Sequence, residues 1–466
     1  MTFSSVNPAT GTKIQAYSEP DPPAVAGAIG EAHEAWTAWR QTSFAQRATV
    51  LRAAAQVLRS RKAELSHLMA AEMGKPITQG EGEVEKCAWA CEHFAEHAER
   101  YLAPDVIDDR SSVVFQPLGV VLAVMPWNFP LWQVFRFAAP ALMAGNAGLL
   151  KHASNVPGCA LAIEDVLRTA GVPEGAFRTL LIGGARVKEV IEHPLVRAVT
   201  LTGSTPAGRS VAALAGSVVK KTVLELGGSD AYVVLEDAEL DRAVEICVAA
   251  RLVNAGQSCI AAKRFVVVEP LVKEFTERFV ARMKDKRVGD PLRDDTEVGP
   301  LARHDLRDAL HAQVTASIEK GARLAVGGEL PEGPGAFYPP TVLVEVKSGM
   351  PAYDEELFGP VAAIVTAREE NDAIRIANDT VYGLGAAVFT RDLDRGARVA
   401  ARLEAGCVCV NAQVVSDPRL PFGGVKQSGY GRELGSYGIR EFVNVKAIVV
   451  TRSSEAQPPP PPPPSE

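Results

Sequence analysis

From residue 113 onward, short apolar runs alternate with segments of helix length, and this alternation limits the possible folds more than any other feature of the sequence. The apolar runs are Val120–Met125, Gly148–Lys151, Thr179–Ile182, Ala198–Thr202, Thr222–Leu226 and Tyr232–Leu235. The segments with helical patterns between them are 131–144, 157–170, 185–193 and 205–215. Strands that alternate with helices form βαβ units, whose right-handed crossovers place helices on both faces of a parallel sheet. The sequence therefore predicts a doubly wound α/β domain.

A second alternating series begins near Asp241 and predicts a second α/β domain. Its apolar runs are Phe265–Val268, Ala322–Val326, Ala362–Val365, Ala386–Phe389 and Cys407–Val410. Ahead of both series, residues 31–73 and a segment near 80–101 have helical patterns, and Gly74 and Pro76 end the first of these patterns.

Two further segments, Val106–Gln116 and Phe442–Val450, fit neither series and are predicted to be strands. We expect them to pair as a small separate sheet, whose exposed edges favour association between subunits. The chain ends with seven consecutive prolines, Pro458–Pro464. Such a run cannot pack into a core, so we predict a disordered tail with no catalytic part.

Composition excludes several classes of function. The chain has 466 residues, and at roughly 150 residues per domain this length suggests about two or three domains. Its 56 acidic and 49 basic residues give a net charge of −7, which argues against binding of nucleic acid. The sequence contains no apolar run of membrane-spanning length and no secretory signal pattern. Its seven cysteines are scattered without a framework, so we predict free thiols and a cytoplasmic location.

The strongest candidate for a nucleophile is Cys259, which follows a glycine-containing turn in Asn254-Ala-Gly-Gln-Ser-Cys. A cysteine in that context can face a cleft and react as a thiolate. The alternative is a buried small hydrophobic residue, which is the usual state of a single cysteine.

Two polar residues follow predicted strands. Glu225 lies at the carboxyl end of an apolar strand, where α/β sheets bind ligands, and burial there would raise its pKa into the range of a general base. The alternative is an ion pair with Lys220 or Lys221. Asn128 lies in the proline-stiffened loop Pro126-Trp-Asn-Phe-Pro and offers a rigid amide donor of the kind that an oxyanion hole requires.

Two other patterns are less specific. No G-x-G-x-x-G motif follows a predicted strand, but Gly203 and Ser204 follow one and open a helix, so their backbone N–H groups could face a phosphate or could simply form a turn. The spacing of His93, Glu96 and His97, with Cys91 nearby, matches a metal motif. A solvated helix face explains the same spacing, and we predict no metal site.

Together, and in this order, these motifs resemble those of the aldehyde dehydrogenase superfamily along essentially the whole chain. The matching motifs are PWNFP at 126–130, LTGS at 201–204, LELGG at 224–228, GQSC at 256–259 and EELFGP at 355–360. The resemblance implies that Cys259 attacks the aldehyde to form a thiohemiacetal and then a thioester. It implies that Asn128 and the Cys259 backbone N–H hold the oxyanion, and that Glu225 activates the hydrolytic water.

The resemblance also implies a nicotinamide coenzyme and the residues that bind it. Those residues are Trp127, Lys151, His152, Ser154, Gly203, Ser204, Leu226, Glu356 and Phe358. The implied fold has two doubly wound α/β domains and a small oligomerisation sheet. Its parts are a coenzyme-binding domain at 1–104 and 119–236, a catalytic domain at 237–438, oligomerisation strands at 105–118 and 439–455, and the disordered tail at 456–466.

The stretch Lys151-His-Ala-Ser154 is similar to that of the bacterial succinate-semialdehyde dehydrogenase branch. Arg136 aligns with an arginine that grips the substrate carboxylate in that branch, whereas Val253 stands where a second arginine is expected, two residues after Arg251. The resemblance thus implies oxidation of succinate semialdehyde to succinate. Because Ser154 is small and neutral, we expect both NAD and NADP to be accepted.

Three alternatives remain at this point: a dehydrogenase for another short aliphatic aldehyde, an aldehyde dehydrogenase that transfers the acyl group to CoA, and a non-catalytic scaffold of the same fold. CoA-acylating members generally lack a glutamate at the position of Glu225. The expected partners are a small aldehyde substrate and further copies of the chain, as a homodimer or homotetramer.

Overall fold

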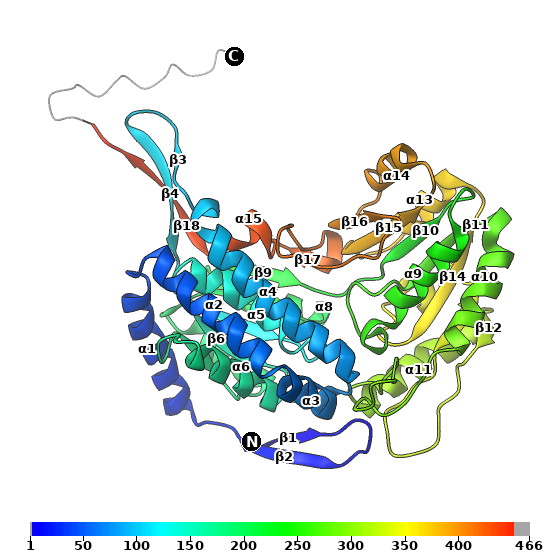
Figure 1. Ribbon diagram of the computed structural model, residues 1–466, viewed down its shortest axis with the longest axis horizontal. Helices are drawn as coiled ribbons and strands as arrows, with labels where there is room; N and C mark the ends of the chain where they lie inside the picture. Colours follow the sequence, from blue (N-terminus) through cyan, green and yellow to red (C-terminus); the bar gives the residue numbers. More distant parts are fainter. Residues whose placement is uncertain (1, 452–466) are drawn as a thin grey trace.

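The computed structural model describes residues 2–451, which form two open α/β sheets and a small projecting sheet (Figure 1). The first sheet has the order β17-β9-β8-β5-β6-β7, in which β17 runs antiparallel to β9 and the other neighbours are parallel. Its strands are β5 (Val120–Met125), β6 (Ala147–His152), β7 (Phe177–Thr179), β8 (Val196–Thr202), β9 (Lys221–Glu225) and β17 (Gly429–Tyr430).

Helices cover both faces of this sheet, as the alternation predicted. Val121 and Ala123 of β5 pack into one core with α2 to α6, whereas Val120 and Leu122 pack into another core with α1, α7 and α8. The helices are α1 (Pro22–Trp39), α2 (Phe44–Ser60), α3 (Lys62–Met73), α4 (Ile77–Tyr101), α5 (Trp132–Met143), α6 (Pro157–Thr169), α7 (Val187–Glu192) and α8 (Thr205–Ser217).

The region 31–73 is helical, but it contains three helices rather than one. Ser43 starts α2 with a reciprocal cap, in which its hydroxyl accepts from the Gln46 N–H at 3.2 Å and its own N–H donates to the Gln46 side chain at 2.8 Å. Such a cap ends the preceding helix direction and satisfies backbone donors that would otherwise be unpaired.

The second sheet has the order β12-β13-β14-β11-β10-β15-β16, and only β12 runs antiparallel to its neighbour. Its strands are β10 (Ala231–Val234), β11 (Arg264–Val268), β12 (Arg323–Val326), β13 (Thr341–Val344), β14 (Val361–Ala367), β15 (Gly385–Phe389) and β16 (Cys407–Val410). The helices of this half are α9 (Leu240–Leu252), α10 (Glu269–Lys284), α11 (His304–Glu319), α12 (Pro351–Asp354), α13 (Glu370–Asn378) and α14 (Leu393–Ala400). The doubly wound α/β architecture is therefore confirmed for both series.

One strand belongs to the other sheet than the one we predicted. The run at 232–235 was grouped with the first series, but β10 pairs with β11 and β15, and Tyr232 packs against Phe265 and Phe389. The chain crosses between the sheets through Leu226–Asp230, which is too short for a helix. An apolar run indicates that a strand is buried, but it does not indicate to which of two sheets the strand belongs. The sequence pattern therefore could not predict the crossing between the sheets.

The predicted small sheet is present and projects from the body of the molecule (Figure 1). Its strands are β3 (Asp105–Val106), β4 (Ser111–Pro117) and β18 (Val443–Val449), with β4 antiparallel to both neighbours. The sequence did not predict the hairpin of β1 (Thr2–Val6) and β2 (Lys13–Ser18), nor strand β13. The proline run lies outside the described residues. Within residues 2–451, no helix combines the length and apolar character needed to cross a membrane.

Candidate active site

The carboxyl ends of the first sheet bring the predicted site residues to one edge. The chain runs from β5 through β6 to β7 on one side, and then through β8 to β9 on the other, so the winding direction reverses between β5 and β8. Loops at such a reversal diverge and leave a crevice in which open α/β sheets bind ligands. The predicted residues of the first half of the chain lie at the ends of β6 and β9, in the loops that follow β5, β6, β8 and β9, and, for Arg136, in α5.

The predicted nucleophile lies on a strained turn before β11. Asn254, Ala255 and Gly256 all have left-handed backbones, with φ of 52°, 53° and 77°. Two consecutive non-glycine residues in that region cost free energy, which the surrounding structure must supply. Buried Arg251 helps to do so, because its Nη2 donates to the Gly256 carbonyl at 2.7 Å.

A side chain at position 256 would also collide with the backbone of Gly359. A Cβ at this position would lie 2.2 Å from the Gly359 carbonyl oxygen. The turn before the cysteine therefore packs directly on the loop that carries Glu356 and Phe358, so two motifs that lie far apart in the sequence are joined.

Lys263 fixes the backbone of the nucleophile and was not predicted. Its fully buried ammonium donates to the carbonyls of Ser258 at 2.8 Å and Cys259 at 2.5 Å, and it lies 3.4 Å from a carboxylate oxygen of Glu356. A lysine has three donors, and these contacts use them on the turn and on Glu356.

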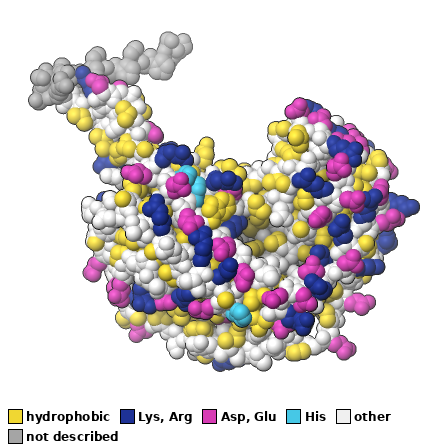
Figure 2. Space-filling view, viewed as in Figure 1, with side chains coloured by type: hydrophobic (Ala, Val, Ile, Leu, Met, Phe, Trp, Pro, Cys, Tyr) yellow, Lys and Arg dark blue, Asp and Glu magenta, His cyan; other side chains and the backbone are white. Residues whose placement is uncertain are grey.

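The thiol of Cys259 is half-buried and lines a cavity of about 550 Å³. Burial raises its pKa to about 12, although the positive charges of Arg136 and Lys263 act in the opposite direction. At neutral pH the group is therefore a thiol, and a base must accept its proton before it attacks an aldehyde. Figure 2 shows that the surface is hollowed between the lobes built on the two large sheets.

Glu225 has the properties of that base. It ends β9, it is 2% exposed, and neither of its carboxylate oxygens has a hydrogen-bond partner among the described residues. Burial, followed by the negative charge of Glu433, raises the pKa of Glu225 well above its ordinary value. A Cβ on Gly423 would lie 2.7 Å from its Oε1, so this glycine leaves room for the carboxylate. The proposed ion pairs of Glu225 with Lys220 or Lys221 are absent in this part of the structure; Lys221 pairs with Glu441 at 2.8 Å and Lys220 donates to backbone carbonyls.

Arg136 connects the two reactive groups electrostatically, since its charge lowers the pKa of both Cys259 and Glu225. It lines the cavity, but its guanidinium already forms a buried ion pair with Glu433 and its Nη2 donates to the Thr202 hydroxyl at 3.2 Å. Glu433 was not predicted as part of the site. Binding of the substrate carboxylate by Arg136 stays a prediction, and the ion pair leaves this cation partly neutralised.

Asn128 lies beside the nucleophile turn. Its Nδ2 donates to the Gln257 carbonyl at 3.1 Å, and Asn254 Nδ2 donates to the Asn128 carbonyl at 2.7 Å. These two bonds join the loop after β5 to the turn before β11. They therefore hold the amide of Asn128 near Cys259, as an oxyanion donor requires.

A buried ion pair supports the same loop from behind. Glu83 of α4 accepts from the N–H groups of Leu131 and Trp132, each at 2.9 Å, and forms an ion pair with Lys75. The Lys75 ammonium lies 3.8 Å from the centre of the Phe129 ring. The sequence analysis predicted no role for either charged residue. Lys75 resembles an ordinary residue before a helix, and Glu83 resembles part of a polar helix face.

The residues expected at the nicotinamide end of a coenzyme come together. Trp127 and Phe358 form an edge-to-face pair with ring centroids 5.7 Å apart. Glu356 accepts from the Gly228 N–H at 3.1 Å, and a Cβ on Gly227 would lie 2.6 Å from Glu356 Oε2. The two glycines of LELGG thus let the backbone lie against Glu356.

The residues expected at the coenzyme phosphates line the start of α8. The Ser204 hydroxyl caps the helix by accepting from Ala207 N–H at 3.5 Å, and the described first turn contains no acidic residue. Leu226 packs against the same turn, where a Cβ on Gly208 would lie 2.5 Å from it. A helix N-terminus without a carboxylate suits an anion, so these residues fit a pyrophosphate.

Lys151 lies near the carboxyl end of β6, and Ser154 follows this strand at the same edge. Lys151 is half-buried, burial alone lowers its pKa, and it has no ion-pair partner among residues 2–451. Ser154 is exposed. A lysine without a carboxylate partner next to an exposed hydroxyl fits a ribose or a 2′-phosphate.

His152 is buried at the same edge. Its Nε2 contacts the Pro130 carbonyl at 2.9 Å and its Nδ1 accepts from the Ala153 N–H at 2.9 Å. The side chain is 5% exposed, and burial lowers its pKa to about 4. Both ring nitrogens therefore tie β6 to the loop that holds Asn128, and a contact of His152 with the coenzyme stays a prediction.

The metal-like spacing lies on α4, away from the sheet edge. His93 stacks on His97 with ring centroids 4.4 Å apart, and its Nε2 lies 3.2 Å from the Tyr101 hydroxyl. Among residues 2–451, no group of three or more potential ligands is placed to hold a metal ion.

Comparisons with known proteins identify the family of the chain. The model of the aldehyde dehydrogenase family matches residues 1–448. A protein of Synechocystis named probable succinate-semialdehyde dehydrogenase [NADP(+)] is 50% identical over 451 residues, covering 96% of this chain and 99% of the relative. Succinate-semialdehyde dehydrogenase [NADP(+)] 1 of Mycobacterium tuberculosis is 48% identical over 454 residues, with coverage of 96% and 99%.

A solved structure gives the same result. Succinic semialdehyde dehydrogenase from Streptococcus pyogenes, in complex with NADP+, superposes with a TM-score of 0.94 at 35% identity, over 97% of this chain and 100% of that one. The chain belongs to the aldehyde dehydrogenase family, and the resemblance noted in its sequence is confirmed.

Proposed function

We propose that this enzyme oxidises succinate semialdehyde to succinate with NADP or NAD as the acceptor, and that Cys259, Glu225 and Asn128 carry out the chemistry. Two observations carry this proposal together: a half-buried thiol on a strained turn, and a buried carboxyl group whose oxygens have no hydrogen-bond partner within residues 2–451. The names of the relatives supply the substrate.

The acylation step begins at Cys259. Glu225, whose pKa is raised, accepts the thiol proton, and the sulfur then attacks the aldehyde carbon. Asn128 Nδ2 and the Cys259 N–H donate to the oxygen of the resulting thiohemiacetal. A bound nicotinamide coenzyme would supply the acceptor for the hydride of this carbon, and Cys259 would then hold the acyl group as a thioester.

Hydrolysis then releases the acid. Glu225 first releases the thiol proton to solvent and then removes a proton from a water molecule, whose oxygen attacks the thioester. The leaving thiolate takes that proton from Glu225, which restores the thiol. In the Glu225→Gln enzyme we expect both steps to slow, because the thiol and the hydrolytic water lose the same base. Hydrolysis should slow more, so a slowed burst of reduced coenzyme should precede a steady state slower by about 10²-fold or more. A steady-state rate equal to that of the native enzyme would show that another group activates the water.

Coenzyme binding is assigned to the carboxyl edge of the first sheet. Gly203 and Ser204 would hold the pyrophosphate, Lys151 and Ser154 the adenosine ribose, and Glu356 the nicotinamide ribose. Trp127, Leu226 and Phe358 would complete the walls of the site. Lys151 supplies positive charge and Ser154 adds none, so the edge accepts either coenzyme.

We assign coenzyme binding to the domain of the six-stranded sheet and the nucleophile to the domain of the seven-stranded sheet, with the boundary in the crossing at 226–230. The small sheet exposes Val106, Val445 and Val449 by 75%, 61% and 69%, and we infer that it pairs with a second copy in a homodimer or homotetramer. We place the enzyme in the cytoplasm.

The test is a panel of initial rates with succinate semialdehyde, butanal and other short aldehydes, each with NADP and NAD. We expect the highest kcat/KM for succinate semialdehyde, and an acid product without added CoA. Equal rates with butanal would contradict the substrate, and a requirement for CoA would contradict hydrolysis by Glu225.

A further inference from the structure

Lys263 is a buried charged residue that takes no part in the proposed chemical steps. It immediately precedes β11 and is 0% exposed. Its backbone is fixed on both sides, because its N–H donates to the Asp230 carbonyl at 3.0 Å and its carbonyl accepts from the Ala363 N–H at 3.0 Å. Burial of an ammonium costs free energy unless fixed acceptors replace the lost water. The acceptors of Lys263 therefore indicate what the residue does.

The ammonium of Lys263 turns back onto the nucleophile turn. It donates to the carbonyls of Ser258 at 2.8 Å and Cys259 at 2.5 Å, and its third contact is a carboxylate oxygen of Glu356 at 3.4 Å. These three acceptors match the three N–H groups of a protonated lysine, so none is left for a ligand. Ser258 and Cys259, by contrast, line the cavity of about 550 Å³. Lys263 thus lies behind the turn and can act on a substrate only through it.

The first of these contacts fixes the peptide group that joins Ser258 to Cys259. A trans peptide group is planar, and its carbonyl and N–H point in opposite directions. No peptide bond among residues 2–451 is cis. The Ser258 carbonyl accepts from Lys263 Nζ and also from the Ala261 N–H at 3.1 Å, so both acceptor sites of this oxygen are filled. Because the carbonyl is held on one side, the Cys259 N–H must point to the other.

The Cys259 N–H is the backbone donor that the proposed mechanism assigns to the oxyanion. It donates to no group of the described chain, so it is free to bind a ligand. A cation on the carbonyl of the same peptide group polarises that group, and such polarisation strengthens the next hydrogen bond. Burial lowers the pKa of Lys263, but the negative charges of Glu356 and Asp230 act in the opposite direction and favour the charged form. A charged Lys263 is therefore placed to strengthen the Cys259 N–H as a donor.

We propose that Lys263 is a positioning residue of the oxyanion site. Its ammonium holds the Ser258 carbonyl, and it thereby aims and strengthens the Cys259 N–H that binds the negative oxygen. This inference rests on the proposed function for the role of Cys259 as the nucleophile, but it does not depend on which aldehyde is the substrate.

The experiment compares two reactions of the Cys259 sulfur, of which only one forms an oxyanion. With p-nitrophenyl acetate the sulfur attacks the ester carbonyl, the carbonyl oxygen becomes negative, and p-nitrophenolate then leaves. With iodoacetamide the sulfur displaces iodide from a saturated carbon, which is followed at the peptide that contains Cys259. A change in the pKa of the thiol alters both rates, since both require the thiolate, so their ratio isolates stabilisation of the oxyanion. Neither reaction transfers a hydride, so neither requires the coenzyme.

In Lys263→Met we expect the ratio of acylation to alkylation to fall about tenfold or more. Loss of a whole oxyanion donor costs about 10²- to 10³-fold, and here the donor stays but loses its support. Lys263→Gln, whose amide keeps a donor but no charge, should lie between Lys263→Met and the native enzyme. Lys220→Met is the matched control. Lys220 also donates to two backbone carbonyls, those of Ile191 and His193, but it lies outside the cavity, so the ratio should stay within about twofold.

A ratio in Lys263→Met within about twofold of the native ratio, in a folded variant, would overturn the inference. An equal fall of both rates would also overturn it, because the effect would then be on the thiol alone. If Lys263→Met does not fold, Lys263→Gln decides by the same criterion, and if neither folds, Lys263 serves stability and the inference fails.

The proposed function can fail separately. If the native enzyme does not prefer succinate semialdehyde, the proposed substrate is wrong, while a lowered ratio in Lys263→Met still supports the inference. If the burst of p-nitrophenolate survives in Cys259→Ala, Cys259 is not the nucleophile, and both the inference and the proposed mechanism are wrong.

Discussion

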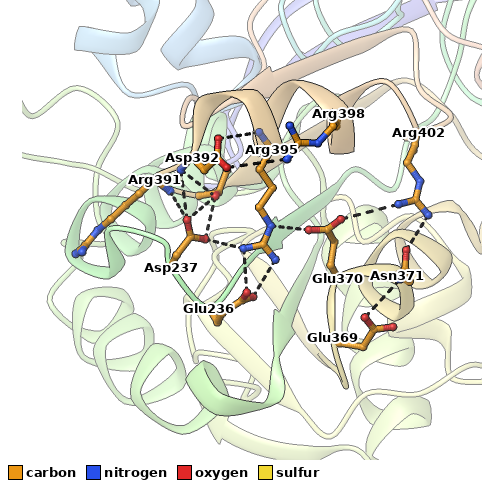
Figure 3. Close-up of polar contacts among 11 residues, drawn as sticks. Glu236, Asp237, Glu369, Glu370, Asn371, Arg391, Asp392, Arg395, Arg398 and Arg402 are labelled. Atoms are coloured by element: carbon orange, nitrogen blue, oxygen red, sulfur yellow. Dashed lines mark hydrogen bonds and ion pairs between the residues drawn. The ribbon is translucent and has the colours of Figure 1, made fainter.

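The two large sheets have corresponding crevices at their carboxyl ends, but the protein fills only one of them with its own side chains. In the seven-stranded sheet the winding reverses between β10 and β15. There Asp237 accepts from the Thr390 hydroxyl at 2.8 Å and from the N–H groups of Arg391 and Asp392 at 3.0 and 3.3 Å (Figure 3). These N–H groups lie at the start of α14, where an anionic ligand would otherwise bind.

Ion pairs close the rest of that crevice. Arg395 of α14 reaches Glu236 at 2.9 Å, Asp237 at 3.3 Å and Glu370 at 2.5 Å, so one guanidinium joins the segment after β10 to the start of α13 (Figure 3). A bidentate or tridentate guanidinium is suited to such a junction because its donors are held in a fixed plane.

The crevice of the six-stranded sheet lacks such a plug among the described residues. The first turn of α8 carries no acidic residue, and Lys151 has no ion-pair partner there. The topology of the two sheets therefore creates two equivalent crevices, and the side chains around each crevice decide which one is open to a ligand.

The largest effect should come from removing the nucleophile that faces the open crevice. Cys259→Ala should lower kcat by about 10³-fold or more, because no other group can form the thioester. Cys409→Ala, on β16 of the seven-stranded sheet, is the matched control and should stay within about threefold. Steady-state rates of reduced coenzyme formation measure both. If Cys259→Ala were as active as the native enzyme, Cys259 would not be the nucleophile and the reaction would not take place at this edge.

The next effect concerns the coenzyme. Ser154→Glu should lower kcat/KM with NADP by about 10- to 100-fold and affect NAD much less, because a carboxylate beside the ribose repels a 2′-phosphate. Initial rates with the two coenzymes measure the ratio, and Ser154→Gln separates charge from size. An unchanged ratio would mean that the ribose binds away from Lys151 and Ser154.

A pH profile tests the electrostatics of the base. Burial and then the charge of Glu433 raise the pKa of Glu225, and the base acts as a carboxylate, so kcat should increase as the pH rises through that pKa. Glu433→Gln removes the neighbouring negative charge, and the rising limb should move to lower pH by about one unit. A limb that stays in place, in a variant with native thermal stability, would show that Glu433 does not act on Glu225.

The smallest effect on activity is expected at the filled crevice. Asp237→Ala removes the acceptor of two backbone N–H groups and should lower the free energy of unfolding by about 1–3 kcal/mol. Its kcat/KM should stay within about twofold of the native value. Chemical denaturation and initial rates measure the two quantities. A large loss of activity without a loss of stability would make this crevice a functional site.

Most of the fold could be predicted from the sequence because buried parallel strands appear in it as continuous apolar runs. The run at 120–125 matches β5 residue for residue, and its alternating burial against two cores followed from the pattern. The pattern could not predict which sheet each strand joins. β10 belongs to the second sheet because the chain crosses between the sheets in a short segment, and β17 pairs with β9 although it lies some two hundred positions later in the chain.

The site shows the same division. The sequence predicted roles for Cys259, Glu225 and Asn128 because each stands in a motif at a strand end or turn that has its own local signal. Lys263 and Glu433 gave no such signal, since a lysine or glutamate in sequence reads as surface charge. Their roles arise only from partners brought together by the fold, such as Arg136 for Glu433. His152 also stands in a motif, and only the fold shows that both its ring nitrogens contact the backbone.

The most direct test of the central claim is a crystal structure of the enzyme with NADP+. The account predicts the coenzyme across the carboxyl ends of β5, β6 and β8, with the pyrophosphate at Gly203 and Ser204 and the adenosine ribose at Lys151. It also predicts that Asp237 keeps its contacts at the start of α14. A coenzyme bound at the α14 crevice, with Asp237 displaced, would contradict the account.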